Sequence, residues 1–371
     1  MFKLINMVKK IKKILSGIYL RLNEFKRFFS DKLITCGVSY FPEYSDRRKS
    51  RTKIWFEQLW NIIRYGDVND FYYLYGFDIK GLRNETEYVD YAKFRARREE
   101  LMHRVNNPQV AMLRDKFFFS IISEALGFRS PRTIAIIAKD SVYLFGERVS
   151  ISLEEFVANH NIDSYTKLVD GECANGVFQM QIIDGTILVD GVDTSIDALR
   201  KKITGGKFLV QERIYQHEKM NAIFPKATNS VRITSLYDKK TDNVIILPSF
   251  LKIGLGEMTV DNWAIGGLIV GLDVETGKLR EWAYYKPGYG KKVQSHPDTG
   301  VVFKDFEIPY FEETKEMIRN IHMQLKEVHS IGWDITITPE GPCIIEGNDN
   351  WEISALQVTN HGMRKEFEQY M

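Results

Sequence analysis

The sequence has few cysteines and no long hydrophobic run. Its three cysteines, Cys36, Cys173 and Cys343, are far apart among 371 residues and form no CxxC pair. This argues against a disulfide framework and a cysteine zinc site, and it fits a reducing compartment. No run of about 18 uncharged apolar residues exists, so no segment is expected to cross a membrane as a helix. Lysines interrupt the apolar N-terminal residues, which argues against a secretory signal and favours a cytoplasmic protein.

An excess of one charge and several common enzyme motifs are also missing. The net charge of +2, from 51 basic and 49 acidic residues, gives no general attraction to nucleic acid. No Gly-Lys-Ser/Thr follows a glycine-rich loop, so there is no Walker phosphate loop. No Ser/His/Asp or Cys/His arrangement indicates a covalent nucleophile. Length and composition (44% apolar, 27% charged) predict a globular chain of two or three packed units without internal repeats.

The first 32 residues predict a basic amphipathic helix. Apolar residues recur at alternating four- and three-residue steps and form one stripe, while lysines and arginines lie mostly away from it. Such a helix can lie in the headgroup region of an anionic membrane, and we expect peripheral contact there. The same spacing also suits docking on the protein itself or on a second copy, and a disordered tail is the third alternative. The stripe consists of Leu4, Val8, Ile11, Leu15, Ile18, Leu22, Phe25 and Phe29.

From about residue 111, strand and helix patterns alternate. Asp115 opens an apolar helix, and Asp184-Gly185 marks a two-residue hairpin turn. We therefore expect an α+β fold in which antiparallel sheets dominate the C-terminal half. The expected strands are 133–138, 143–145, 165–169 and 208–212, with hairpins over 229–285, and the expected helices include 195–204 and 309–328.

The most informative pattern is a hairpin near the C-terminus, where two apolar runs flank a Pro-Glu-Gly turn. A three-residue loop centred on Glu340 places Asp334 directly opposite Glu346. Asn348 shares that face, because strand side chains repeat every second residue. The face then carries two carboxylates and an amide oxygen, which are hard ligands of the kind that hold Mg²⁺. An ordinary exposed hairpin with scattered polar residues is the alternative.

Two further segments are suited to a nucleotide. Lys167 precedes a loop with Gly171 and Gly176, where glycines let backbone N–H groups approach phosphate oxygens and lysine supplies a point charge. At the exit of an apolar strand, Gln211 and Glu212 can offer backbone groups to an adenine edge and a carboxylate to ribose hydroxyls. Taken alone, the first pattern is more commonly an ordinary glycine-rich turn, and the second is more commonly a strand that ends in solvated charged residues.

Side chains between these segments complete the candidate site. Arg232 begins another alternating strand, and its forked guanidinium can clamp phosphates; a surface arginine is the alternative. Lys252 and Asn262 come from the hairpin before the acidic one. The single histidine of this region, His217, is expected to cap a helix or form hydrogen bonds and not to act as a base.

The order of these motifs carries more information than any one of them. In chain order they are Asp115-Lys116, Lys167 with Gly171, Gln211-Glu212 with Gln216-His217, Asn229-Ser230-Val231-Arg232, Val260-Asp261-Asn262 with Gly266-Gly267, Ile331-Gly332-Trp333-Asp334, and Ile345-Glu346-Gly347-Asn348 with Trp351. This succession resembles the sugar-transfer associated ATP-grasp family, which is sometimes described alongside hexapeptide-transferase proteins. The resemblance covers roughly residues 70–370 and is most specific in the last two motifs.

The resemblance implies an ATP-grasp fold, in which two α+β subdomains clasp ATP. The chain would comprise a basic amphipathic helix (1–40), a mostly helical region (41–110) and the ATP-grasp domain (111–371), with a lid subdomain at about 163–210. The residues implied to bind ATP are Lys116, Lys167, Gly171, Gly176, Gln211 and Glu212. Those implied at the reacting groups are Arg232, Lys252 and Asn262, and the implied Mg²⁺ ligands are Asp334, Glu346 and Asn348.

The function implied by this resemblance is an ATP- and Mg²⁺-dependent carboxylate–amine ligase that acts through an acyl phosphate. The expected substrates are a small-molecule or glycan carboxylate, such as a sugar acid or amino acid, and an amine, in surface polysaccharide synthesis. The alternatives are an ATP-grasp phosphotransferase and a non-catalytic ATP-binding scaffold at the membrane. We expect a cytoplasmic protein at the inner face of the membrane, with no nucleic-acid partner, and the oligomeric state stays open.

Overall fold

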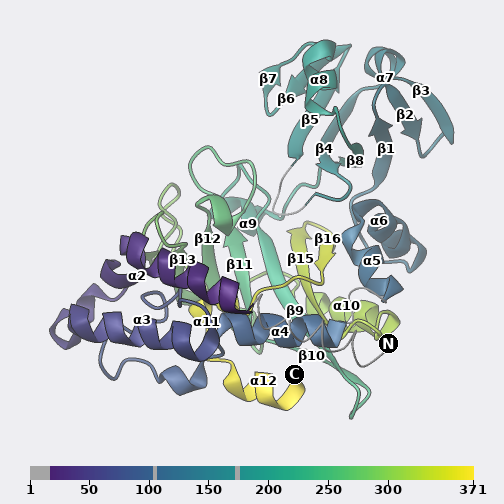
Figure 1. The fold of residues 1–371 in the computed structure, drawn as a ribbon. Helices are drawn as coiled ribbons and strands as arrows, with labels where there is room; N and C mark the ends of the chain where they lie inside the picture. Colours follow the sequence, from purple (N-terminus) through teal and green to yellow (C-terminus); the bar gives the residue numbers. More distant parts are fainter. Residues whose placement is uncertain (1–16, 103–106, 172–175) are drawn as a thin grey trace, which may run out of the picture. The chain divides into compact units, whose positions relative to one another are not determined.

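The computed structural model describes residues 17–102, 107–171 and 176–371 and divides into two compact units (Figure 1). The first unit consists of Met1–Leu101, Pro287–Lys292 and Glu352–Met371, and the second of Met102–Lys286 and Val293–Trp351. The first half of the predicted N-terminal helix, residues 1–16, lies outside the described residues. Within the described ranges, no helix is both long and apolar enough to cross a membrane.

The first unit is built from helices, as the sequence predicts for the N-terminal region. A helix over residues 17–30 packs on its neighbours through a small apolar core of Phe28, Ile34, Ile62 and Val68. Ser50 begins the longest of the described helices in this unit, because its side chain accepts a hydrogen bond from the Lys53 N–H. The other elements are α2 (Lys32–Cys36), η1 (Pro42–Arg47), α3 (Arg51–Tyr65), η2 (Glu85–Glu87), α4 (Tyr91–Met102), α11 (Ile353–Thr359) and α12 (Arg364–Tyr370).

The aromatic stretch over residues 71–77 forms turns and contributes to packing. The buried Phe77 ring contacts the rings of Tyr72, Tyr75 and Tyr88, and Tyr75 also contacts Tyr88. Gln357 on α11 joins this cluster, since its Nε2 donates to the Tyr75 hydroxyl at 3.2 Å. These residues thus form the interior of the first unit.

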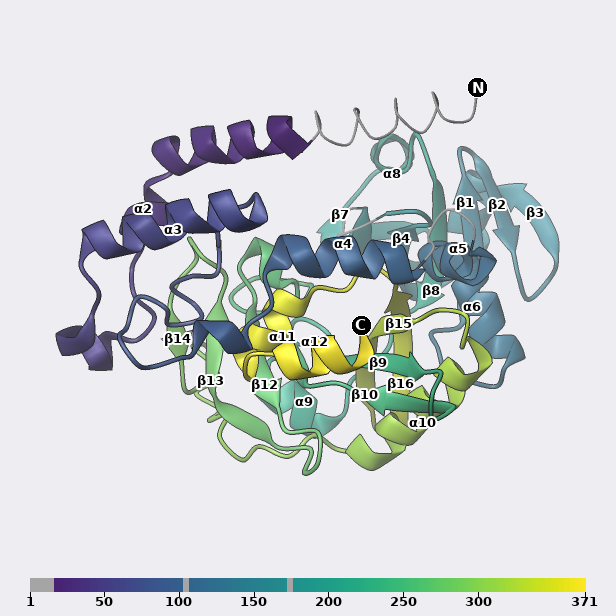
Figure 2. The same ribbon diagram turned by 60° about the horizontal axis from the view of Figure 1, so that its bottom comes forward.

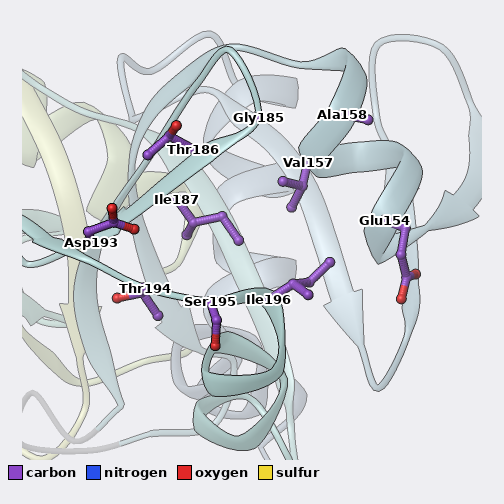
Figure 3. A pocket seen from close by; sticks show the side chains of 10 residues that line it. All are labelled: Glu154, Val157, Ala158, Gly185, Thr186, Ile187, Asp193, Thr194, Ser195 and Ile196. Carbon is purple, nitrogen blue, oxygen red and sulfur yellow. The ribbon is translucent and has the colours of Figure 1, made fainter.

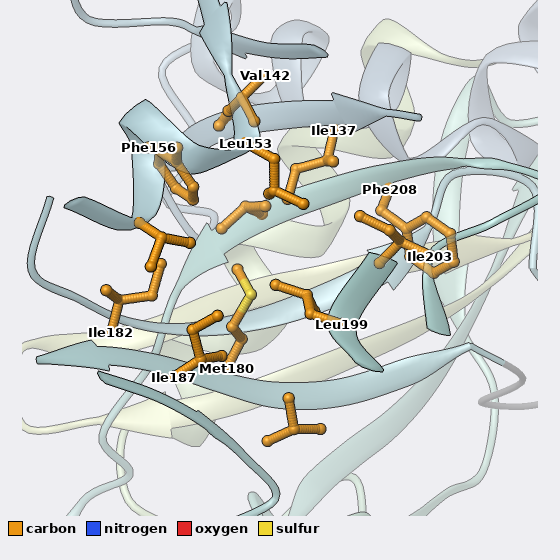
Figure 4. Packing of buried hydrophobic residues seen from close by; sticks show 14 of the residues in the cluster. Ile137, Val142, Leu153, Phe156, Met180, Ile182, Ile187, Leu199, Ile203 and Phe208 are labelled. Atoms are coloured by element: carbon orange, nitrogen blue, oxygen red, sulfur yellow. The ribbon is translucent and has the colours of Figure 1, made fainter. Parts of the chain in front are cut away.

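The first sheet of the second unit has eight antiparallel strands in the order β3-β2-β1-β8-β4-β5-β6-β7. Two short helices, α7 (Leu153–Asn159) and α8 (Ile196–Lys202), insert Phe156 and Leu199 into a core that also contains Met180 and Val210 (Figure 4). The sheet begins at Thr133, earlier in the chain than the expected lid boundary. Its strands are β1 (Thr133–Ala138), β2 (Ser141–Leu144), β3 (Val149–Ser152), β4 (Ile162–Leu168), β5 (Val177–Ile183), β6 (Thr186–Val189), β7 (Val192–Asp193) and β8 (Lys207–Glu212).

The second sheet is also antiparallel, with the order β14-β13-β12-β11-β9-β15-β16 and with β10 paired to β9 (Figure 2). Its strands are β9 (Ser230–Asp238), β10 (Asn243–Ile246), β11 (Ser249–Ile253), β12 (Leu268–Leu272), β13 (Leu279–Tyr285), β14 (Lys292–Val293), β15 (Ser330–Thr338) and β16 (Gly341–Asn348). The helices of this unit include α5 (Pro108–Arg114), α6 (Lys116–Ala125), α9 (Glu218–Ile223) and α10 (Phe311–Gln324), with η3 (Trp263–Ile265). Together the two sheets confirm the expected α+β class.

Turn chemistry explains why part of this topology is predictable from the sequence. Asp184 and Gly185 both adopt positive φ angles, 47° and 80°, and join β5 to β6 where Ile183 pairs with Thr186. That geometry is the two-residue turn that matches strand twist, and aspartate and glycine adopt it readily. The hairpin predicted at this dipeptide is confirmed.

A buried polar network lies between α10 and the second sheet. The His322 ring accepts at Nδ1 from the Ser235 hydroxyl at 2.7 Å and donates from Nε2 to the Val328 carbonyl at 2.9 Å. The Trp333 indole donates to the same serine oxygen at 2.7 Å. Burial lowers the pKa of His322 from 6.5 to about 4, because the neutral ring is favoured there.

This histidine should make the protein less stable in acid. The unfolded chain binds a proton at His322 below pH 6.5 while the folded protein does so only near pH 4. The free energy of unfolding should therefore fall between these values by about 3 kcal/mol from this group. Denaturant unfolding at several pH values would measure the slope. His322→Gln should flatten it, whereas His361→Gln, at an exposed position, should not; equal slopes for the three proteins would contradict the assignment.

Candidate active site

The C-terminal hairpin places Asp334 directly opposite Glu346, as the sequence predicts, but the turn length and the strand register differ from the prediction. Thr338 pairs with Gly341, so the turn has two residues and the expected three-residue loop is wrong. The register shifts between Asp334 and Ile335, because β16 carries an extra residue in a β-bulge. Beyond the bulge the two carboxylate residues are opposite each other.

Asn348 joins these carboxylates on the same face. Its Nδ2 donates to Glu346 Oε1 at 3.1 Å, which is possible because residues two apart on a strand point to one side. The hairpin thus presents two carboxylates and one amide side by side, with Asp334 almost fully buried.

Two cations from neighbouring strands reach Asp334. Arg232 on β9 lies opposite Asp334 and donates from Nε and Nη2 to its two carboxylate oxygens at 2.6 and 2.8 Å. This bidentate geometry is the strong form of an arginine–carboxylate pair. Lys252 on β11 places Nζ 3.2 Å from Asp334 Oδ2. The sheet therefore brings together three predicted residues that are far apart in the sequence.

Asp261 is a member of this cluster that the sequence analysis did not select. One of its oxygens lies 3.5 Å from Lys252 Nζ, and the other accepts from the Ser230 N–H at 2.8 Å and from the Ser230 hydroxyl. Asp261 therefore positions Lys252 between two carboxylates. The Asp261-Asn262 pair is the sequence signal for this residue, although the sequence analysis predicts Asn262 as the functional one.

Asn262 and His217 act as caps in this structure. The Asn262 side chain accepts from the Ala264 N–H at 2.8 Å and begins η3. His217 Nδ1 accepts from the Lys219 N–H at 3.1 Å at the start of α9, which confirms the capping role expected for this histidine. The Asn262 amide oxygen is thus engaged in local backbone structure.

The charges of the cluster stabilise one another. Burial opposes ionisation of Asp334, but Arg232 and Lys252 outweigh it and hold the pKa of Asp334 well below its usual range. Burial likewise opposes the charge on the two cations, and the carboxylates outweigh it and raise the pKa values of Arg232 and Lys252. Burial raises the pKa of Asp261, and Lys252 offsets part of that increase. The charged forms of Asp334, Arg232 and Lys252 are therefore favoured by one another.

Lys167 and Lys116 supply positive charge from the other sheet and from α6. Burial lowers the pKa of Lys167, Glu346 counteracts this, and the like charge of Lys116 lowers the pKa further. Lys116 lies at the first position of α6, where its Nζ donates to the Gly171 carbonyl. The buried Lys167 ammonium, with the like charge of Lys116 and one carboxylate near it, forms a site that a polyanion would stabilise.

The loop between β4 and β5 is described only at its ends, because residues 172–175 lie outside the described ranges. Gly171 donates its N–H to the Leu168 carbonyl at 3.1 Å. Gly176 has a φ of 71°, and a Cβ there would lie 2.9 Å from the Leu168 Cβ. A side chain at position 176 would meet both steric problems, so glycine is required for the chain to enter β5.

At the end of β8, Gln211 has a structural role and Glu212 is exposed. The buried Gln211 amide donates from Nε2 to the Pro131 carbonyl at 3.2 Å. The Glu212 carboxylate accepts from the Arg132 N–H at 3.3 Å and from its Nε at 3.2 Å. The Glu212 side chain is 44% exposed, so a ligand can reach it, whereas the Gln211 side chain holds the strand in place.

The hairpin residues fit a magnesium ion that a nucleotide helps to bind. Within the described ranges, no group of three or more His, Cys, Asp or Glu side chains is placed to hold a metal. Mg²⁺ commonly uses only one or two carboxylates and takes further ligands from substrate phosphates and water. Asp334, Glu346 and the Asn348 amide provide such a partial set, although both Asp334 oxygens also accept from Arg232.

A surface pocket lies elsewhere, on the first sheet (Figure 3). Val157 of α7, Ile187 of β6 and Ile196 of α8 line its apolar side, and Glu154 and Asp193 add carboxylates. None of the predicted site residues lines this pocket. It is separate from the charged cluster.

Curated sequences and solved structures were both compared with the chain. No curated protein matches the sequence. Among solved structures, the chain is similar to D-alanine-D-alanine ligase from Helicobacter pylori (11% identity, TM-score 0.39, covering 70% of this chain and 61% of that one). It is also similar to the VanG D-Ala:D-Ser ligase from Enterococcus faecalis (14% identity, TM-score 0.36, covering 65% and 53%). The chain spans about half the length of the solved structures it matches.

A family model identifies the chain directly. The model for sugar-transfer associated ATP-grasp proteins matches residues 96–370, which include both sheets and the charged cluster. The match begins later in the sequence than the expected limit near residue 70. The chain belongs to the sugar-transfer associated ATP-grasp family.

Proposed function

We propose that this protein is an ATP- and Mg²⁺-dependent carboxylate–amine ligase that acts through an acyl phosphate. The observation that carries the proposal is the ionised cluster in which Arg232 and Lys252 share Asp334, with Lys167 close to Glu346. Groups of this kind favour a reaction in which negative charge builds up on a transferred phosphoryl group.

Each part of the site has a proposed role. Lys116 and Lys167 bind the phosphates of ATP, next to the loop that begins at Gly171 and ends at Gly176. The Glu212 carboxylate and the backbone at Gln211 hold the adenosine. Asp334, Glu346 and Asn348 would hold Mg²⁺, which when bound neutralises part of the triphosphate charge. Asn262 supports the site through the backbone that it caps.

The proposed reaction has two steps. A carboxylate oxygen of the substrate attacks the γ-phosphorus, the bond to the bridging oxygen breaks, and ADP leaves with the electron pair. An amine then attacks the acyl carbon, the acyl–phosphate bond breaks, and inorganic phosphate leaves as the nitrogen loses a proton to solvent. Arg232 and Lys252 stabilise the charge on the phosphoryl oxygens in both steps, the arginine through the N–H groups that do not donate to Asp334.

The substrate class is proposed from the family description. The sugar-transfer association favours a sugar acid or amino acid as the carboxylate, joined to an amine during surface polysaccharide synthesis. Work on such glycans would take place in the cytoplasm at the inner face of the membrane, which residues 1–32 could contact. A phosphotransferase using the same groups is the main competing function.

The experiment is an assay with ATP, Mg²⁺, a panel of sugar acids and amino acids, and a panel of amines. We expect ADP release that requires both substrates, an amide product in equal amount, and no reaction after chelation of Mg²⁺. Hydroxylamine in place of the amine should trap the acyl phosphate as a hydroxamate. A phosphorylated hydroxyl product without any amine would establish a phosphotransferase instead, and nucleotide binding without turnover would favour the scaffold.

A further inference from the structure

Helix α3 carries an apolar stripe on its outer side. Phe56, Trp60 and Ile63 follow one another at helical spacing and are 59%, 58% and 53% exposed. The opposite side of the helix, with Ile54 and Ile62, is buried in the first unit. The buried inner side of α3 is the side that packs against the core. Packing in the first unit therefore does not explain the exposed apolar residues on the outer side.

The stripe continues onto the helix over residues 17–30. The Phe56 ring contacts Trp55 at 5.1 Å, and Trp55 contacts Phe29 at 6.5 Å, so aromatic rings connect the two helices. Phe29 is 71% exposed, and Leu22 on the same helix is 61% exposed. Figures 1 and 2 show this helix alongside α3. We refer to Leu22, Phe29, Phe56, Trp60 and Ile63 as the apolar face.

The burial differs from what the sequence stripe predicts. Phe25 and Phe28 pack against the core of the first unit, whereas Ile18, Leu22 and Phe29 remain exposed. Docking on the protein itself therefore uses only part of the predicted stripe. Single exposed apolar residues are normal, but a continuous face of large side chains on two adjacent helices indicates an interaction surface.

The surroundings of the apolar face are basic. Residues 1–33 contain nine lysines and arginines and two acidic residues, whereas the remainder of the chain has a net charge of −5 because the whole chain is +2. Five of these lysines lie in residues 1–16, immediately before the exposed helix. On α3, the exposed Lys53 and Arg64 neighbour the stripe in the helical projection. Basic residues are thus concentrated in the N-terminal part of the sequence, and Lys53 and Arg64 flank the stripe on α3.

We propose that the apolar face docks on an anionic lipid surface. Aromatic and aliphatic side chains flanked by basic residues suit the headgroup boundary, where rings enter the apolar layer and nearby lysines and arginines are attracted to the anionic headgroups. A second copy is a poorer occupant, because it would bring the same positive charge to the interface. The proposal adds α3 to the N-terminal segment as a membrane-binding element and does not depend on the reaction catalysed.

The experiment is co-sedimentation of the full-length protein with phosphatidylcholine vesicles, with and without phosphatidylglycerol. We expect binding that requires phosphatidylglycerol and weakens with salt. The triple variant Phe56→Ser, Trp60→Ser and Ile63→Ser should bind at least about tenfold more weakly. Tyr289→Ser, at a position 53% exposed in the same unit, should bind like the parent.

Three outcomes would overturn the proposal. The first is a parent protein that does not bind anionic vesicles, and the second is a triple variant that binds them as well as the parent. The third is a parent protein that forms a stable dimer in sedimentation velocity while the triple variant is monomeric. Thermal stabilisation by a non-hydrolysable ATP analogue should be the same in the triple variant and the parent. That second measurement shows that the variant is folded and separates lipid docking from the nucleotide site.

Discussion

Replacing Asp334 by asparagine should reduce ATP turnover by about a thousandfold or more. The substitution removes the charge that Arg232 and Lys252 share, together with one of the proposed Mg²⁺ ligands. Arg232 would then lack its carboxylate partner and Lys252 would keep only Asp261, so the free energy of unfolding should also fall by about 2–4 kcal/mol. Steady-state ADP release and denaturant unfolding of the same preparations measure the two effects separately.

Glu340→Gln is the matched control for this substitution. It removes a carboxylate from the same hairpin, but the Glu340 side chain is 65% exposed and pairs with Arg129 on the surface at 2.7 Å. An exposed pair of this kind contributes little to stability because solvent screens it, so both stability and turnover should stay close to the parent values. Unchanged turnover in a folded Asp334→Asn protein would remove Asp334 from the active site.

Replacing Lys167 by methionine should weaken ATP binding by about a hundredfold without destabilising the protein. Burial and the charge of Lys116 disfavour the Lys167 ammonium in the free protein, so an apolar side chain of similar length is tolerated there. In the complex, the ammonium would contact phosphate oxygens, so removing it would lower the affinity for ATP directly. The measurement is the thermal stabilisation produced by a non-hydrolysable ATP analogue with Mg²⁺.

The control is Lys207→Met, an exposed lysine on β8, which should retain the full stabilisation. The pH dependence gives an independent check. Since the pKa of Lys167 is lowered from 10.5, raising the pH should deprotonate it earlier than an ordinary lysine and weaken nucleotide binding in the parent. The same series in Lys167→Met should be flatter. Equal nucleotide affinity in parent and variant would contradict the phosphate role.

The hairpin and the main strands are predictable because their signals are local. Asp184-Gly185 requires a tight turn, and Asp115 caps α6 by accepting from the N–H groups of Phe117 and Phe118. The shared face of Glu346 and Asn348 follows from the two-residue alternation of side chains along β16. These features depend on neighbours in the sequence, so periodicity and turn residues are enough to predict them.

The remaining features depend on contacts between distant segments. Sequence alternation cannot show that Asp261, and not Asn262, reaches Lys252, because that choice depends on how the loop before β12 approaches β9. The bulge in β16 compensates for a turn one residue shorter than predicted, and neither change is visible in composition. The burial of the Gln211 side chain is likewise explained only by its hydrogen bond to the Pro131 carbonyl, which comes from a distant part of the sequence.

The position of β9 between β11 and β15 in the second sheet has a consequence for folding during translation. β9 pairs with β15 from Ser230 to Leu236, and β15 is synthesised about a hundred residues later. Until β15 emerges from the ribosome, β9 has an open edge whose Val231 and Ile233 are fully buried in the finished protein. An open apolar edge is prone to pairing with other chains. Translation that stops within that interval would yield fragments that aggregate, and nascent chains would depend on chaperones until the last hairpin is complete.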